Sequence, residues 1–184
     1  MDINTTFDYW LRVAPFAGFK VGKFSRPEFV GSHQTPRNLN ELTIGQLIDL
    51  SSLGDTNESM YKVVGAVLGL SHDEVAKSKA VEVVRFVGWV YSEVEKINKI
   101  FGSTNKKPTA IEKRAGIDSL KFGLFGMLDW YAVRMGIQDH DQVLKTPWLR
   151  IYKCMDMDNR KRAYEIRLRK LEAEEMRHQS RMRR

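Results

Sequence analysis

The chain has 184 residues, of which 42% are hydrophobic and 29% charged, and it carries a net charge of +7. This length is enough to bury a core without disulfides or a structural metal, and the single cysteine, Cys154, excludes an intramolecular disulfide and a cysteine-rich zinc site. No run of about 18 uncharged apolar residues occurs, so no membrane span is expected. The acidic second residue of MDINTTFDYWLRVAPF argues against a secretory signal, and a cytosolic protein is expected.

Residues 1 to 40 combine seven aromatic side chains with three prolines and several glycines. This composition indicates an extended N-terminal arm, within which Phe19, Val21 and Lys23 alternate as in a short strand. Because an aromatic arm is costly to expose to water, it either folds over its own helical core or contacts a neighbouring molecule. The aromatic residues of the arm that we predict to contact a partner are Tyr9, Trp10, Phe16, Phe19, Phe24 and Phe29.

Four helix-start signatures follow the arm. In each, a Thr, Ser or Asp precedes a Glu or Gln by three residues, so that each side chain can accept a hydrogen bond from the other residue's backbone N–H. Thr146-Pro147 marks a fifth start, with proline at the first helical position. Glycines at Gly69, Gly102 and Gly136 mark expected helix ends. The four pairs are Thr43 with Gln46, Ser71 with Glu74, Thr109 with Glu112, and Asp139 with Gln142.

These signals predict an all-α fold with a compact multi-helix core over residues 41 to 157. The strongest helical pattern covers residues 79 to 101, where apolar side chains recur every three or four residues and form one stripe, from Val83 to Phe101. Trp89 lies off this stripe, so it contacts either another helix of the same chain or a partner. The other expected helices cover residues 44 to 53, 58 to 68, 72 to 77, 110 to 120, 124 to 135, 140 to 145, and 148 onward.

The segment GIDSLKFGLFGMLDWYAVRMGI, residues 116 to 137, is apolar on nearly every side when coiled into helices. Within it, Leu128 and Tyr131 face one way while Met127 and Trp130 face another. A helix that is apolar on two sides needs two neighbours. We expect the first to be the valine stripe, and the second to be either the helix that begins at residue 148 or a partner protein contacted by Trp130.

The C-terminal residues 158 to 184 hold ten Lys or Arg and five Asp or Glu, and they predict a protruding basic helix. The basic residues are distributed around the helix, so no single face is suited to reading base edges. This helix docks either on an acidic protein or on the phosphates of DNA. The residues expected to provide the docking charge are Arg160, Lys161, Arg162, Arg167, Arg169 and Lys170.

The chain contains no recognisable catalytic or metal-binding pattern. Its four histidines are dispersed and show no metal-ligand spacing, and no nucleophile is flanked by the residues that would activate it. We therefore expect no enzymatic activity, no cofactor and no metal.

Two stretches carry a resemblance to a known class of proteins. They are LNELTIGQLIDLSSL, residues 39 to 53, and PTAIEKRAGIDSLKFGLFGMLDWYAVRMGIQDHDQVLKTPWLRIY, residues 108 to 152. Both resemble small helical structural or assembly proteins of tailed bacteriophages and of prophages in gut bacteria, several of which are described as tail assembly chaperone-like.

The resemblance implies a non-enzymatic protein that holds or bridges other phage structural or tail proteins during tail or neck assembly, as a homo-oligomer or ring. It implies that the protein acts in the cytoplasm of the host bacterium. Whether the protein is also retained in the finished virion is left open by the resemblance. The aromatic arm and the basic helix depart from this pattern, and they suit a subunit of the particle at least as well as a transient chaperone. The alternative that the charge distribution leaves open is a basic nucleic-acid-binding accessory protein.

Overall fold

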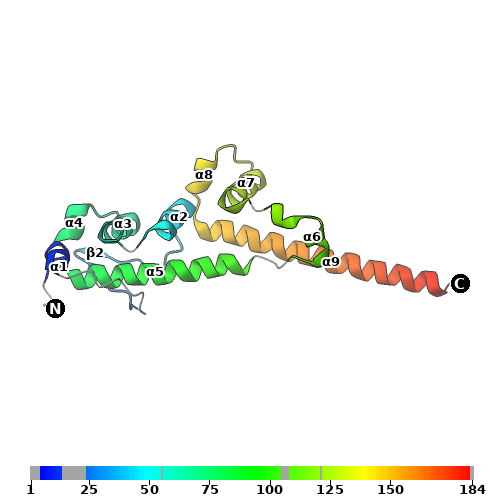
Figure 1. The fold of residues 1–184 in the computed structure, drawn as a ribbon, viewed down its shortest axis with the longest axis horizontal. Coiled ribbons are helices and arrows are strands. Elements are labelled where there is room, and N and C mark those ends of the chain that lie inside the picture. The colour runs from blue at the N-terminus through cyan, green and yellow to red at the C-terminus, as the bar shows by residue number, and fades with distance from the viewer. Residues whose placement is uncertain (1–4, 14–23, 55, 105–107, 121, 183–184) are drawn as a thin grey trace.

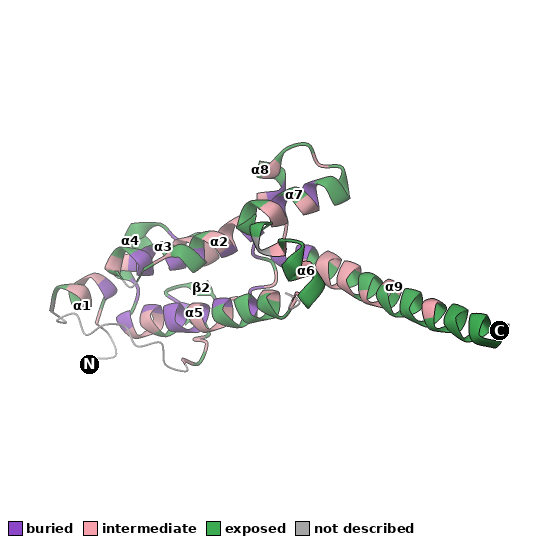
Figure 2. Cartoon of the chain, turned by 45° about the vertical axis from the view of Figure 1, so that its right-hand side comes forward, coloured by how far each residue is buried: buried purple, intermediate pink, exposed green. Residues whose placement is uncertain are grey.

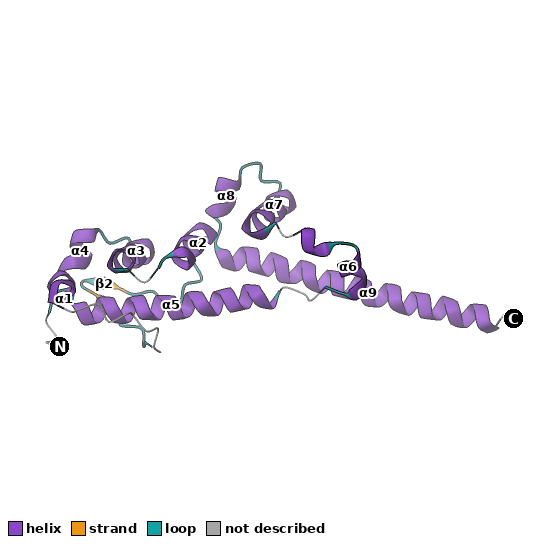
Figure 3. Cartoon of the chain, in the orientation of Figure 1, coloured by secondary structure: helices purple, strands orange, loops and turns teal. Residues whose placement is uncertain are grey.

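The computed structural model describes residues 5–13, 24–54, 56–104, 108–120 and 122–182. Helices make up 73% of the described residues, which contain a single two-stranded hairpin, so the predicted all-α fold is confirmed (Figures 1 and 3). The elements in chain order are α1 (Phe7–Val13), β1 (Phe29–Val30), β2 (His33–Gln34), α2 (Ile44–Ser52), α3 (Asn57–Leu68), α4 (His72–Lys77), α5 (Ala80–Ser103), α6 (Ala110–Arg114), the 3-10 helix η1 (Ile117–Ser119), α7 (Gly123–Met135), α8 (His140–Leu144) and α9 (Trp148–Met182).

Most helices begin at the residues that the capping patterns predict. Thr43, Ser71 and Thr109 each accept a hydrogen bond from the backbone three residues later, and the Gln or Glu there accepts one in return. The hydrogen bonds from Ser71 hold the pKa of Glu74 below its usual value. Asp139 caps α8 differently, because it accepts from the N–H of Asp141.

Two predicted helix ends differ from the structure. The helix expected over residues 110 to 120 ends at Arg114, because Gly116 adopts the left-handed conformation, with φ of 83°, and the chain continues as η1. Gly102 does not end α5, which continues to Ser103. Gly69 and Gly136 do cap α3 and α7 with positive φ, as predicted.

The valine stripe of α5 forms the centre of the core. Its members from Val83 to Ile97 are buried, and α5 packs against α1, α2, α3 and β1. Figure 2 shows buried residues along the N-terminal half of α5. Trp89 is also buried, with its ring centroid 5.7 Å from that of Phe86. Trp89 is therefore a core residue of its own chain, which corrects the alternative of a partner contact.

The first described segment is helical where an extended arm is expected. Residues 7 to 13 form α1. The backbone N–H of Phe7 donates to Ser78 O at 2.8 Å and that of Ala80 donates to Thr5 O at 2.9 Å, so the start of α1 is joined to the junction of α4 and α5. The Phe7 side chain is fully buried beside Tyr61. This part of the arm therefore folds on its own core.

The second described part of the arm lies along α5. Val30 of the hairpin is buried, and the N–H of Gly31 at its turn donates to Glu82 Oε2 of α5 at 3.0 Å. Phe24 packs so closely on Gly88 that a Cβ at that position would lie 2.1 Å from the Phe24 ring. The absence of a side chain at Gly88 is what lets this aromatic residue approach the helix.

Gly88→Ala is expected to lower the free energy of unfolding by about 1 to 2 kcal/mol, because overpacking outweighs the helix-propensity gain of about 1 kcal/mol. Gly102→Ala on the same helix, where no atom lies within 4 Å of the added Cβ, is the matched control. It is expected to raise the stability by about 0.5 kcal/mol. Urea unfolding followed by circular dichroism measures both, and equal changes would contradict the packing of Phe24 on Gly88.

The last helix, α9, runs for 35 residues without a break, so the predicted boundary at residue 158 falls inside it. Its C-terminal half extends beyond every other element in Figure 1. Over the residues that the structure describes, no helix combines the length and apolar character needed to cross a membrane.

Candidate functional site

A large open groove lies where α2 and the end of α5 meet the α6–η1–α7 segment and α9. Its volume is about 1280 Å³, and its walls come from α2, the end of α5, the α6–η1–α7 segment and one face of α9. The apolar side chains that line it are Ile44, Leu47, Ile48, Phe101, Pro108, Ile117, Leu120, Phe122, Leu124, Met127, Met155 and Ile166.

The wall formed by α6, η1 and α7 exposes several large apolar side chains to solvent. Leu120, Phe122 and Leu124 are all exposed, and they follow one another at the turn from η1 into α7. Phe122 lies against Gly126, where an added Cβ would come within 2.7 Å of the Phe122 Cβ. Exposed apolar residues that adjoin one another and line a concavity are typical of a surface that binds a partner.

The other side of α7 is fixed to the chain. Leu128 and Tyr131 are buried, α7 packs on α8, and Arg134 donates two hydrogen bonds to the carboxylate of Asp158 on α9, at 3.0 and 2.9 Å. The hydrogen bonds to Asp158 raise the pKa of Arg134. α7 is therefore joined to α9, the helix that begins at Trp148, by this ion pair, while its main packing partner is α8. The predicted packing of α7 on the valine stripe is corrected, because α1, α2 and α3 already cover that stripe.

The opposite wall is a face of α9. Its groove-lining residues, Met155, Asn159, Arg162 and Ile166, are spaced by four, three and four positions and so share one side of the helix. The amide of Asn159 donates to the carbonyl oxygen of Thr104 at 3.3 Å, just beyond the end of α5. This contact holds α9 beside α5.

Trp148 sets the position of α9 relative to α2. Its indole N–H donates to the carbonyl oxygen of Leu39 at 2.7 Å in the interior, and its backbone N–H donates to Leu42 O at 3.0 Å. The N–H of Ile44 donates to Thr146 O at 2.8 Å in the opposite direction. The two walls of the groove are thereby joined at one end.

The aromatic residues predicted to contact a partner do not line this groove. Tyr9 and Phe29 are exposed, Trp10 and Phe24 are half-buried, and Phe16 and Phe19 lie outside the described residues, as does the strand expected from Phe19 to Lys23. Trp130 is half-buried on α7, with its ring centroid 6.1 Å from that of Tyr131. Leu120, Phe122 and Leu124, which do line the groove, belong to the apolar segment 116 to 137. The excess of apolar residues in that segment is the sequence signal that points to them.

The predicted docking charges all lie on α9 and are exposed. Arg162 lines the groove, and Arg160 pairs with Asp156 one turn earlier at 2.8 Å. The structure thus brings part of the basic helix and the apolar segment together on opposite walls of one groove. The remaining predicted docking residues, Lys161, Arg167, Arg169 and Lys170, lie outside the groove lining.

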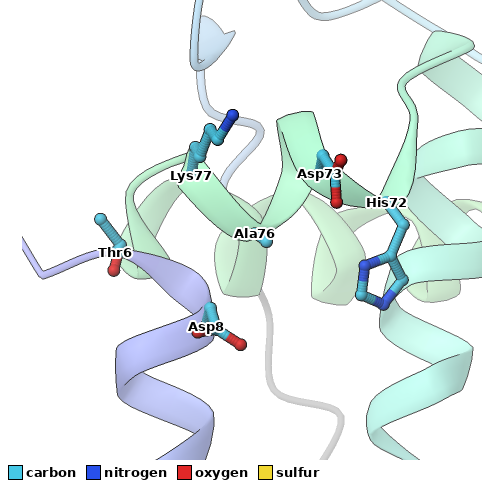
Figure 4. A pocket seen from close by; sticks show the side chains of 6 residues that line it. All are labelled: Thr6, Asp8, His72, Asp73, Ala76 and Lys77. Atoms are coloured by element: carbon cyan, nitrogen blue, oxygen red, sulfur yellow. The ribbon is translucent and has the colours of Figure 1, made fainter.

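A second, smaller hollow of about 360 Å³ lies between α1 and α4 and is shown in Figure 4. It contains Asp8, His72 and Asp73, but Asp8 pairs with Arg12 at 2.8 Å and the His72 ring stacks on Tyr61 with the centroids 3.7 Å apart. Across the described ranges, no group of three or more His, Cys, Asp or Glu side chains is arranged to hold a metal ion. The apolar groove is therefore the candidate site.

Replacing Leu120 and Leu124 together by Asp is expected to lower the fluorescence of the apolar dye ANS about twofold, because both line the groove and are exposed. The matched control replaces Ile111 and Val133 by Asp, since these are 77% and 76% exposed and do not line the groove. Neither double variant is expected to change the free energy of unfolding by more than about 1 kcal/mol. An equal loss of dye binding in both would show that the groove does not bind apolar molecules.

A comparison with known proteins finds no family model, no curated protein and no solved structure that matches this chain.

Proposed function

We propose that this protein is a non-enzymatic morphogenesis or structural protein of a tailed bacteriophage, which holds another tail or neck protein in the apolar groove. The observation that carries the proposal is the location of the two stretches that resemble phage assembly proteins. Residues 39 to 53 contain α2, and residues 108 to 152 contain α6, η1, α7, α8 and the start of α9. Although far apart in the sequence, both stretches contribute residues to the lining of the groove.

The chemistry of the groove supports a protein segment as its occupant. Its lining is mostly apolar, with Glu112 and Arg162 among the few charged side chains. An amphipathic helix bound in such a groove would bury its apolar residues against Leu120, Phe122 and Leu124, as in other helix-in-groove complexes. Closing the groove in this way would remove from water the apolar surface that Leu120, Phe122 and Leu124 leave exposed.

The proposal places the protein in the cytoplasm of the host bacterium during assembly, in several copies, and either only there or also in the finished virion. The test is deletion of its gene from the phage, with particle yield and tail morphology measured by electron microscopy. We expect particles that lack complete tails or necks, and rescue by the wild-type gene and by the Ile111→Asp/Val133→Asp control. The Leu120→Asp/Leu124→Asp variant is expected not to rescue.

Mass spectrometry of purified virions separates a particle subunit from a transient assembly factor. A deletion that leaves particle yield and tails unchanged would contradict the proposed function.

The second candidate function is that of a nucleic-acid-binding accessory protein, because α9 carries many exposed basic residues. Micromolar binding of the full chain to random-sequence duplex DNA at physiological salt, lost in steps as basic residues are removed, would favour that candidate.

A further inference from the structure

The protruding part of α9 carries an apolar stripe that its own chain does not cover. The stripe consists of exposed Met157, Tyr164, Leu168, Leu171 and Met182. Their spacing of seven, four, three and eleven places every one of them at the first or fourth position of a seven-residue repeat. A stripe of this period is the surface along which two helices pair in a coiled coil.

This stripe faces away from the groove. The groove-facing residues Asn159, Arg162 and Ile166 lie about half a helical turn around α9 from Tyr164 and Leu168, at 3.6 residues per turn. Occupation of the groove therefore leaves the stripe accessible. The two surfaces belong to different contacts.

The charges beside the stripe identify its occupant. Arg160 and Arg167 precede the stripe on one edge, and Glu165 and Glu172 follow it on the other, each acidic residue five positions after a basic one. In two parallel helices in the same register, this offset places each Arg opposite the Glu of the second helix, and these edge charges set partner choice and orientation. An antiparallel pair of the same helix would instead place Arg160 beside Arg181 and Glu165 beside Glu172, and would leave only Arg167 beside an opposite charge, Glu174.

Within the described part of the chain, Glu165, Arg167 and Glu172 form no ion pair, and Arg160 contacts only Asp156 on its own helix. The edge charges are therefore on the surface of the single chain and available for contacts with another helix. A duplex DNA partner would attract the two Arg but repel the two Glu on the same stripe, and it would leave the apolar residues in water.

We propose that residues 157 to 182 of α9 pair with the same segment of a second copy as a parallel, in-register, two-stranded coiled coil. The paired length is roughly 38 Å at 1.5 Å per residue. The polar residues Lys161 and Glu175 occupy first positions of the repeat and His178 a fourth position. Polar residues at such positions weaken a coiled coil while specifying its register and number of strands, so a reversible dimer is expected.

The inference deepens the proposed function, since it names a second copy as one partner and rests on the proposal that several copies act together. It depends on residues outside the groove. A failed dimer test leaves the groove and the gene-deletion result untouched, and a failed deletion test leaves the dimer measurable in the purified protein.

The first experiment is sedimentation equilibrium of the full-length chain at micromolar to tens of micromolar concentration. The expected mass is twice that of the 21.3 kDa chain. Leu171→Glu is expected to raise the dissociation constant at least about tenfold, because the charge would enter the apolar seam. Met176→Glu is the matched control, since Met176 is 65% exposed against 63% for Leu171 but lies off the stripe, and it is expected to leave the dimer unchanged.

Circular dichroism establishes that both variants are folded. A wild-type chain of single mass at every concentration, or an equal effect of Leu171→Glu and Met176→Glu, would overturn the inference. So would a monomeric chain that instead binds duplex DNA through α9.

The second experiment tests orientation and register with engineered disulfides in a Cys154→Ser background. His178→Cys is expected to cross-link two copies under mild oxidation, because parallel in-register helices place the same seam position of both copies side by side. Met176→Cys, off the stripe, is expected to remain uncross-linked. A dimer in which His178→Cys does not cross-link would exclude the parallel arrangement.

Discussion

Replacing Trp148 by Ala is expected to lower the free energy of unfolding by about 4 kcal/mol. Trp148 is buried against Phe101 and Tyr152, with ring centroids 5.9 and 6.4 Å away. Its loss would leave a cavity and would also leave the buried carbonyl of Leu39 without the indole N–H that donates to it at 2.7 Å. An unpaired buried acceptor adds about 1 to 3 kcal/mol to the loss of apolar contact.

Urea unfolding followed by circular dichroism measures this change. Trp130→Ala is the matched control, because Trp130 is half-buried on α7, and a loss of less than about 2 kcal/mol is expected. Trp148→Phe keeps most of the apolar contact and removes only the donor, so a loss of about 1 to 3 kcal/mol is expected. If Trp148→Ala destabilised the chain no more than Trp130→Ala, Trp148 would not be the residue that joins α2 to α9.

Replacing Phe7 by Ala is expected to lower the free energy of unfolding by about 3 to 5 kcal/mol. Phe7 is fully buried, with its ring centroid 5.1 Å from that of Tyr61 and 6.0 Å from that of Trp10. The substitution would remove an aromatic side chain at the place where α1 meets α3, α4 and α5. Chemical unfolding of the full chain gives the measurement.

Tyr9→Ala provides the control on the same helix, because Tyr9 is 60% exposed and Phe7 is 0% exposed. We expect Tyr9→Ala to change the stability by less than about 0.5 kcal/mol. A Phe7→Ala variant with unchanged stability but a smaller assembled mass would instead show that α1 packs on a neighbouring molecule. The two variants together therefore distinguish an arm that packs on its own core from an arm that contacts a neighbouring molecule.

Local signals in the sequence determined where most helices begin and end. The side chains of Thr43, Ser71 and Thr109 cap helices because their partners lie only three residues away, so no distant part of the chain is needed to place them. The apolar spacing from Val83 to Ile97 likewise identified the buried face of α5, since burial of one face of a helix follows its period. The protruding character of α9 followed from its lack of apolar surface for a core.

The sequence did not identify what each apolar face would contact. The valine stripe of α5 has the composition to accept α7, yet it is covered by α1, α2 and α3. The choice among apolar neighbours depends on shape and chain connectivity, because the hydrophobic effect is not directional. For the same reason, the composition of residues 1 to 40 did not reveal that Phe7 is a core residue.

Only the tertiary structure determined the groove and the side of α9 that remains accessible. Leu120 and Ile166 are 46 positions apart and line the same concavity. They are brought together by contacts between residues distant in sequence, namely Trp148 with Leu39 and Arg134 with Asp158. The heptad stripe and its flanking charges are present in the sequence, but a stripe on a helix is a contact surface only when its own chain leaves it uncovered. That depends on which face of α9 packs against the core, which is set by contacts that no local pattern contains.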